Sequence, residues 1–228
     1  LTCPADIMVG NDPGSCSAAV NYPSATTQGN CGEVIYSHPS GSQFPIGTTM
    51  VTVMATRSDM TTQTCTFNVT VTNNQGPTIK THVALSSLGP PFDHRLVNVG
   101  LRGRATANCS AIGAVQVTVY SDEDDGFWGF WHFAPDAKEI AFGTLRLRRQ
   151  RNGWRNGRVY LIISSVTDAV GNAAHSCETV TVPHSNSRAD RARVKAQADA
   201  ARAQCQATGA PPAGYFVIGD VPTRRQRH

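Results

Sequence analysis

The alternation of apolar and polar residues in the first third of the chain predicts short β-strands. Through residues 48–54, threonine, valine and methionine alternate with the period of two that is typical of a strand with one buried face. Further short β segments are expected over residues 5–9, 16–23, 33–38 and 63–72, separated by turn-forming Asn, Asp, Pro and Gly. Strands that recur about every ten residues are typical of a β-sandwich.

A break in this pattern at residues 73–77, Asn-Asn-Gln-Gly-Pro, predicts that the first domain covers residues 1–76. Beyond the break the chain partly repeats itself, because residues 168–182 parallel residues 59–71. We therefore expect a second, related β-sandwich over residues 77–185.

The C-terminal part changes character. Residues 186–208 are rich in alanine, arginine and glutamine and predict one helix, which Ser185 or Ser187 can cap and Gly209 can end. Residues 209–228 are expected to form an extended tail. This tail contains an apolar run that is suited to pairing as a strand, namely Tyr215, Phe216, Val217 and Ile218.

The first domain carries four motifs in the order in which one known family shows them. They are Leu1-Thr2-Cys3-Pro4-Ala5-Asp6-Ile7, Asp12-Pro13-Gly14-Ser15-Cys16, the run Ser40 to Thr49 with Phe44-Pro45-Ile46-Gly47 at its centre, and Cys65-Thr66-Phe67-Asn68-Val69-Thr70-Val71. Residues 1–78 resemble a hyalin repeat, the HYR domain family. The resemblance implies an extracellular, immunoglobulin-like β-sandwich that is associated with adhesion and is not a catalyst.

The second domain more loosely resembles the immunoglobulin-like segments that follow hyalin repeats in bacterial secreted or surface proteins. The expected fold class is therefore all-β, with two tandem immunoglobulin-like, or fibronectin type III-like, β-sandwiches followed by a C-terminal α-helix and an extended tail.

Seven cysteines, with none in a Cys-x-x-Cys pair, indicate disulfides in an oxidising compartment. Cys109 and Cys177 are the only cysteines of the second domain, so we expect them to pair. Cys205, in the helix, is then the odd cysteine: it forms either an intermolecular disulfide or a small apolar contact on a packed helix face.

The four N-terminal cysteines leave the pairing open. The internal repeat favours Cys31 with Cys65, which leaves Cys3 with Cys16. The resemblance to hyalin repeats instead implies Cys3 with Cys65, which leaves Cys16 with Cys31.

An acidic run follows a predicted strand and offers the oxygen-rich composition that calcium needs, at Asp122, Glu123, Asp124 and Asp125. It lacks the spacing of a helix-loop-helix calcium loop, so a solvated acidic loop is the alternative. No other cofactor is expected.

Five aromatic residues within positions 127–133 favour either a hydrophobic plug over the sandwich or a contact surface for a protein or a sugar. The candidate contact residues here are Trp128, Phe130 and Trp131, to which Trp154 adds a further stacking surface. In the hairpin that follows, Arg146 and Arg148 are expected on one solvated strand face, where they could also meet an acidic polysaccharide or a neighbour's acidic loop.

Charge and motif content narrow the function. The net charge of +4 is uneven, because residues 1–78 hold one Arg against four acids whereas residues 186–228 hold eight Lys or Arg against three. This distribution argues against nucleic-acid binding. No apolar run is long enough to span a membrane, and no catalytic motif is present.

We therefore expect a non-enzymatic, secreted or surface-attached structural and adhesion protein of bacterial type. Its expected partners are other protein chains, including copies of itself, which would assemble into a polymer or surface layer through the C-terminal tail. The alternative is a carbohydrate-binding accessory module of a secreted system, with a polysaccharide as its ligand.

Overall fold

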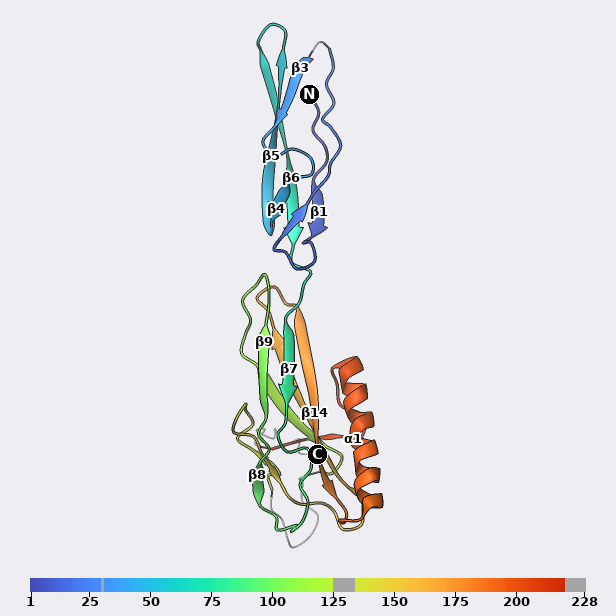
Figure 1. Ribbon diagram of the computed structural model, residues 1–228. Helices are drawn as coiled ribbons and strands as arrows, with labels where there is room; N and C mark the ends of the chain where they lie inside the picture. Colours follow the sequence, from blue (N-terminus) through green and yellow to red (C-terminus); the bar gives the residue numbers. More distant parts are fainter. Residues whose placement is uncertain (30, 125–133, 220–228) are drawn as a thin grey trace, which may run out of the picture. The chain divides into compact units, whose positions relative to one another are not determined.

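The computed structural model describes residues 1–29, 31–124 and 134–219, without the side chain of Cys31 (Figure 1). These residues form β-strands and one C-terminal helix, which confirms the predicted fold class. The chain divides into two compact units. The first contains residues 1–76, 107–111 and 168–172, and the second contains residues 77–106, 112–167 and 173–228. Two short segments of the first unit thus come from the sequence expected for the second sandwich.

Six strands make up the first unit: β1 Ile7–Gly10, β2 Ser17–Ala19, β3 Cys31–Tyr36, β4 Gln43–Pro45, β5 Gly47–Arg57 and β6 Thr62–Thr72. Four of them form a sheet in the order β1-β6-β5-β3, and β2 pairs with β4. Strand β1 runs parallel to β6, whereas the remaining neighbours are antiparallel.

The predicted period of two determines the core of the first unit. Val51 and Val53 of β5 are fully buried, and Thr52 between them points to the opposite, more exposed face. Phe44 of β4 is also fully buried in this core. The ring of Tyr22 packs edge-on against Phe67 of β6, with the ring centroids 4.9 Å apart.

The strands of the second unit are β7 Thr78–His82, β8 Leu96–Asn98, β9 Arg102–Thr106, β10 Gln116–Ser121, β11 Ala137–Lys138, β12 Arg146–Arg148, β13 Gly157–Thr167, β14 Ala173–Pro183 and β15 Phe216–Ile218. The largest sheet has the order β14-β13-β10-β15, and smaller sheets are formed by β11-β12-β8 and by β7-β9. The strands paired in these three sheets run antiparallel to their neighbours.

Strand β13 is buried on both faces. Tyr160 and Ile162 point into the main core, while Leu161 and Ile163 point to the opposite side, where they pack beneath the helix with Cys177. A strand covered on both faces reads as a nearly continuous apolar run, which matches its sequence from Val159 to Ile163.

Helix α1, Arg188–Thr208, lies along the sheet beside β14 (Figure 1). Ser187 caps its N-terminus by accepting a hydrogen bond from the Asp190 amide, and Gly209 ends it in the left-handed conformation, with φ of 72°. The buried face consists of small side chains, at Val194, Ala198, Ala201 and Cys205. Because these side chains are short, the helix backbone can approach the sheet closely.

The expected extended tail folds back onto its own chain. Strand β15 pairs antiparallel with β10, and Val217 lies opposite Tyr120. Ile218 is only 1% exposed and belongs to the main core, so the prediction that it contacts another chain is wrong. Tyr215 also packs within its own chain, beside Val194 and Ala198 of α1. The apolar run of the tail thus forms the fourth strand of the sheet β14-β13-β10-β15.

The described residues form three disulfides, and two of them differ from the expected pairings. Cys3 is bonded to Cys65, the pair that the family resemblance implied. Cys16 is bonded to Cys109, not to Cys31, and Cys177 is bonded to Cys205, not to Cys109. The expected intermolecular role of Cys205 is therefore wrong, because this residue faces β14 of its own chain.

The expected Cys109–Cys177 pairing, which assumed that both cysteines belong to the second domain, failed for a physical reason. The segment around Cys109 belongs to the first compact unit, where it meets Cys16. Cys177 lies on the face of β14 that is turned toward α1, whereas Val180 and Val182 face the core. Cys109 and Cys177 therefore lie in different units, and each is bonded to a cysteine of its own unit.

Candidate functional site

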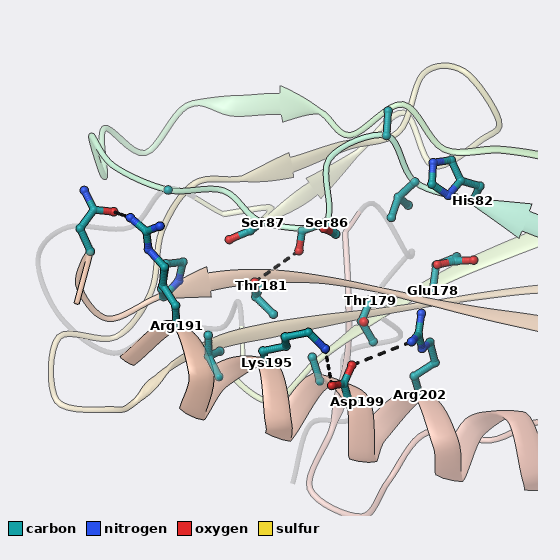
Figure 2. Close-up of a pocket in the computed structure, with 17 residues that line it drawn as sticks. His82, Ser86, Ser87, Glu178, Thr179, Thr181, Arg191, Lys195, Asp199 and Arg202 are labelled. Carbon is teal, nitrogen blue, oxygen red and sulfur yellow. Dashed lines mark hydrogen bonds and ion pairs between the residues drawn. The ribbon is translucent and has the colours of Figure 1, made fainter. Parts of the chain in front are cut away.

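A groove of ≈ 680 Å³ runs between α1 and β14 in the second unit (Figure 2). Its walls come from three places in the sequence, and Figure 2 shows their side chains converging. The segment after β7 contributes Ser86 and Ser87, and the backbone oxygen of Ser86 accepts hydrogen bonds from the amide and the hydroxyl of Thr181. The helix contributes Arg191, Lys195, Asp199 and Arg202, and the sheet contributes Glu178, Thr179 and Thr181.

Most charges along the groove have a partner of opposite sign. Lys195 Nζ lies 2.5 Å from Asp199 Oδ2, and Arg202 Nη2 lies 3.9 Å from Asp199 Oδ1. Burial raises the pKa of Glu178, although Arg202 and His82 act in the opposite direction. The groove is therefore a polar surface with nearly balanced charge rather than a strong site for a charged ligand.

The acidic run predicted as a calcium site is turned into the protein. Asp122 accepts hydrogen bonds from the Val159 amide at 2.7 Å and from Gln197 Nε2 at 2.7 Å. Glu123 accepts one from the Asn152 amide at 2.8 Å, while its other oxygen is buried without a donor among the described residues. Burial raises the pKa of both carboxyls.

This arrangement does not resemble a calcium cage. Asp122 and Glu123 already serve the backbone and Gln197, and Asp125 lies outside the described residues. Across the described parts of the chain, no group of three His, Cys, Asp or Glu side chains is placed to hold a metal ion. The calcium hypothesis thus has no support from Asp122 or Glu123.

A buried ion-pair network lies beside the acidic run. Arg158, 2% exposed, donates from Nη1 to Asp136 at 2.5 Å and from Nε to Ser121 at 2.8 Å. Its guanidinium carbon also lies 4.7 Å from the ring centroid of Tyr160. On the other side, Asp136 accepts a hydrogen bond from Arg148 Nε at 2.9 Å. One carboxylate thus joins two arginines within the fold.

The alternation of Arg148 with Leu147 predicted that Arg148 lies on a solvated strand face, and this prediction is wrong. Its guanidinium is buried because Asp136 and the backbone oxygens of His94 and Pro135 accept its hydrogen bonds. Arg146 is half exposed and lies 3.4 Å from Glu139. Arg148 is therefore structural, and only Arg146 remains accessible to a partner.

The predicted aromatic contact residues divide into two groups. Trp128, Phe130 and Trp131 lie outside the described residues. Trp154, in the turn before β13, is 97% exposed. Two more exposed apolar side chains occur on β15, where Phe216 is 45% and Val217 is 46% exposed. The tail strand therefore combines one core residue with two accessible ones.

Sequence reasoning missed a basic surface on β7 and β9. Lys80 lies directly opposite Arg104, and His82 lies opposite Arg102. All four residues are exposed. The signal was present in the sequence, because Lys-Thr-His and Arg-Gly-Arg each place basic residues at the period of two that brings them to one strand face.

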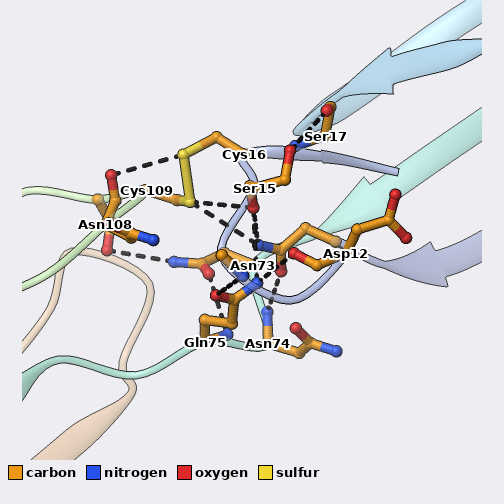
Figure 3. The surroundings of a disulfide bond; sticks show 12 residues. Asp12, Ser15, Cys16, Ser17, Asn73, Asn74, Gln75, Asn108 and Cys109 are labelled. Atoms are coloured by element: carbon orange, nitrogen blue, oxygen red, sulfur yellow. Dashed lines mark hydrogen bonds between the residues drawn. A yellow bond between two sulfur atoms is a disulfide. The ribbon is translucent and has the colours of Figure 1, made fainter. Parts of the chain in front are cut away.

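The Cys16–Cys109 disulfide sits in a polar cluster of the first unit (Figure 3). Gln75 Nε2 donates to the Asp12 backbone oxygen at 2.6 Å, and Asn11 Nδ2 donates to the Ser15 oxygen at 2.5 Å. The segments that meet here are far apart in sequence, and their amides hold the loop around Cys16 in place. Because both of these side-chain amides bond to backbone oxygens, the cluster serves structure rather than chemistry.

Nearby, a carboxylate of the same unit organises the other short segment. Asp168 accepts hydrogen bonds from Ser110 Oγ at 2.7 Å and from the Asn172 amide at 2.8 Å. Burial alone would raise the pKa of Asp168, but these hydrogen bonds hold it below its usual value. Asp168 is thus an ionised anchor for residues 168–172.

Comparisons with solved structures find cadherin-domain proteins at low similarity. The chain is similar to protocadherin gamma C5 EC1-3, with 13% identity and a TM-score of 0.34, over 77% of this chain and 65% of that one. Protocadherin gamma B2 domains 3-6 give 12% and 0.32, over 80% and 47%. Human protocadherin-24 EC1-2 gives 11% and 0.33, over 78% and 91%. The chain spans less than two thirds of the first two structures.

Two further comparisons, one with curated protein sequences and one with family models, bear on the family to which the chain is similar. Curated protein sequences give no significant match to the chain. Among the described residues, no helix has both the length and the apolar character that crossing a membrane requires. Residues 1–71 match the family model of the HYR domain. They contain the Cys3–Cys65 disulfide and strands β1 to β6, except for the last residue of β6. The chain therefore carries an HYR domain over residues 1–71.

Proposed function

We propose that this chain is a non-enzymatic, extracellular adhesion-type protein that contacts other protein chains. The HYR domain match and the three disulfides support this proposal, because disulfides persist in oxidising compartments outside the cytosol. The cross-linked β-sheets supply a stable scaffold, and the contacts are made by exposed side chains and sheet edges.

The finer proposal is that β15 forms a contact between copies of the chain. It is the last strand of the sheet β14-β13-β10-β15, and edge strands offer backbone groups to an added strand. The observation that carries this proposal is the exposure of Phe216 and Val217, at 45% and 46%. Adding a strand from a second copy would bury both side chains.

Point substitutions test this contact without damaging the fold. Deleting the tail would remove Ile218 from the core, so the informative variants are Phe216→Lys and Val217→Lys. Sedimentation velocity over a concentration series should show association of the wild type and weaker association of both variants. Val170→Lys is a matched control, because Val170 is 58% exposed and lies in the first unit.

The result can also contradict the proposal. Monomeric wild-type protein at every concentration would remove self-association as the mode of contact. Association of the Val217→Lys variant equal to that of the wild type would exclude β15 as the contact strand.

A second candidate function, carbohydrate binding, is favoured by the exposure of Trp154. An indole that is 97% exposed can stack on a sugar ring without rearrangement of the protein. Addition of neutral polysaccharides should then change tryptophan fluorescence, and Trp154→Ala should abolish the change. The absence of any change with the wild-type protein would argue against this function.

A further inference from the structure

The exposed face of the β7-β9 sheet carries a square of basic side chains. Register places Lys80 opposite Arg104 and His82 opposite Arg102. Directly opposite residues in an antiparallel pair have Cβ atoms about 4.5–5.5 Å apart, and the next pair on the same face follows about 6.8 Å along the strand. The four side chains therefore form two adjacent rows, which we call the basic square.

The fold fixes the direction in which these side chains point. Ile79 of β7 is 8% exposed, and Gly103 of β9 faces inward, where an added Cβ would lie 2.8 Å from the ring of Phe142. Gly103 lies opposite Thr81, whose hydroxyl is bonded to Ser176 of β14 at 2.7 Å. Since neighbouring residues on a strand alternate between faces, Lys80, Arg102 and Arg104 point outward, while His82, at the end of β7, also lines the groove beside α1.

Three members of the basic square, Lys80, Arg102 and Arg104, have no counter-charge among the described residues, whereas His82 lies near Glu178 of β14. Among residues 1–29, 31–124 and 134–219, no acidic group lies within ion-pairing distance of Lys80, Arg102 or Arg104, whereas Arg95, Arg146 and Arg149 each have one. Like charges directly opposite each other destabilise a sheet. The protein thus bears a repulsive arrangement that its own residues do not relieve.

Hydroxyl groups extend the same face by one more row. Thr78 lies opposite Thr106, and their Oγ1 atoms are 3.0 Å apart. Both threonines are exposed, as are the basic residues beside them. The surface thus offers cations and then hydrogen-bonding hydroxyls along one direction of the sheet.

We propose that the basic square binds a linear acidic polysaccharide, one that carries carboxylate or sulfate groups along an extended chain. An extended polyanion can place successive anionic groups over the two rows, while its sugar hydroxyls meet Thr78 and Thr106. The attraction follows from charge, and it decreases as added salt screens the charges.

Other polyanions fit this surface less well. Single-stranded nucleic acids depend on aromatic side chains for base stacking, and the described face presents only Thr, Lys, His and Arg. A second copy of the chain offers few free acids in its first unit, where Glu33 is exposed. Asp6, Asp12 and Asp59 there already accept hydrogen bonds from Asn68, Ala19 and Thr61.

This proposal goes beyond a protein contact through β15, because it names another face and another class of ligand. The full chain should be tested by calorimetry at low ionic strength with heparin, with polygalacturonate and with neutral dextran. We expect both acidic polymers to bind, dextran not to bind, and the affinity to fall as sodium chloride is added. The double variant Lys80→Gln/Arg104→Gln should bind at least about tenfold more weakly, which corresponds to about 1.4 kcal/mol.

Two controls separate the site from general charge. Arg57→Gln/Arg193→Gln removes the same charge from exposed positions elsewhere and should bind within about twofold of the wild type. Trp154→Ala should also bind like the wild type, because the proposed binding depends on charge rather than stacking. The double variant at Lys80 and Arg104 should unfold at the same or a higher temperature than the wild type, because the repulsion is relieved.

Several results would overturn the proposal. These are no binding of either acidic polymer by the wild type, equal binding by the double variant at Lys80 and Arg104, equal loss in the Arg57 and Arg193 control, or equal binding of dextran. Association of protein copies that depends on Lys80 and Arg104 without polysaccharide would assign the surface to a protein partner instead. None of these outcomes affects the proposal for β15, which is tested by sedimentation of the Phe216 and Val217 variants.

Discussion

Cys205 of helix α1 is bonded to Cys177 of strand β14, with their Cα atoms 6.1 Å apart. Both residues are buried, and the bond lies in a cluster with Leu161 and Ile163 of β13. The apolar face of α1 is otherwise mostly alanine, which buries little area on packing. The disulfide thus fixes α1 to the sheet, because the packing of the small helix side chains alone stabilises this contact only weakly.

Removing this bond should destabilise the second unit. In the loop-entropy model, a bond across a separation of 28 residues stabilises by about 3 to 4 kcal/mol. Cys177→Ala/Cys205→Ala should lower the free energy of unfolding by about this amount. Urea denaturation followed by circular dichroism at the helix band measures this loss of stability, because the helical signal of the described residues comes from α1. An unchanged midpoint for the variant would show that packing alone holds α1.

Local features of the fold could be predicted from the sequence. The strand around Val51 and Val53 follows from alternation alone, and Ser187 and Gly209 bound the helix as expected of capping residues. Such signals act within a few residues of each other. They therefore do not depend on how distant segments meet.

The disulfides and the buried arginines depend on contacts that local patterns do not contain. Cys16 and Cys109 are separated by 93 residues and meet because residues 107–111 belong to the first unit. Arg148 has the alternation of a solvated position, but Asp136 and two carbonyl oxygens make its burial favourable. One signal was overlooked: Cys177 has the opposite parity to Val180 and Val182, so it faces the helix rather than the core.

The Cys16–Cys109 bond should make a larger contribution than its exposed surroundings suggest. Its separation of 93 residues corresponds to about 4 to 5 kcal/mol in the loop-entropy model. Cys16→Ser/Cys109→Ser should therefore lower the thermal stability of the first unit, measured by calorimetry. Digestion without reduction, followed by mass spectrometry, should recover a peptide pair that contains Cys16 and Cys109. Recovery of Cys16 linked to any other cysteine would contradict this pairing.

The buried pair Arg158–Asp136 should be far more important for stability than an exposed pair. Arg158→Met leaves Asp136 with Arg148 as a cationic partner but removes the 2.5 Å contact, so we expect a loss of about 3 kcal/mol. Lys195→Met, which breaks the exposed pair with Asp199, should cost less than about 1 kcal/mol. Urea denaturation of both variants compares them directly. Equal losses would mean that burial of Arg158 adds nothing to the strength of the pair.

Glu123 should make the stability of the second unit depend on pH. Burial raises the pKa of Glu123 in the folded state, so the folded protein holds this proton to a higher pH than the unfolded chain does. The contribution is therefore favourable below the ordinary pKa of about 4.3 and is lost as the pH rises through the raised value. Glu123→Gln cannot ionise and keeps a carbonyl oxygen for the Asn152 amide.

The stability of Glu123→Gln relative to the wild type should accordingly increase as the pH rises from about 4 to 7. Urea denaturation at a series of pH values measures this difference. Asp190→Asn should behave in the opposite way, because a hydrogen bond from Ser185 lowers the pKa of Asp190, and the stability it provides is lost as the pH falls. A difference between Glu123→Gln and the wild type that does not change with pH would mean that Glu123 ionises equally easily in both states, and that its unpaired buried oxygen is reached by water.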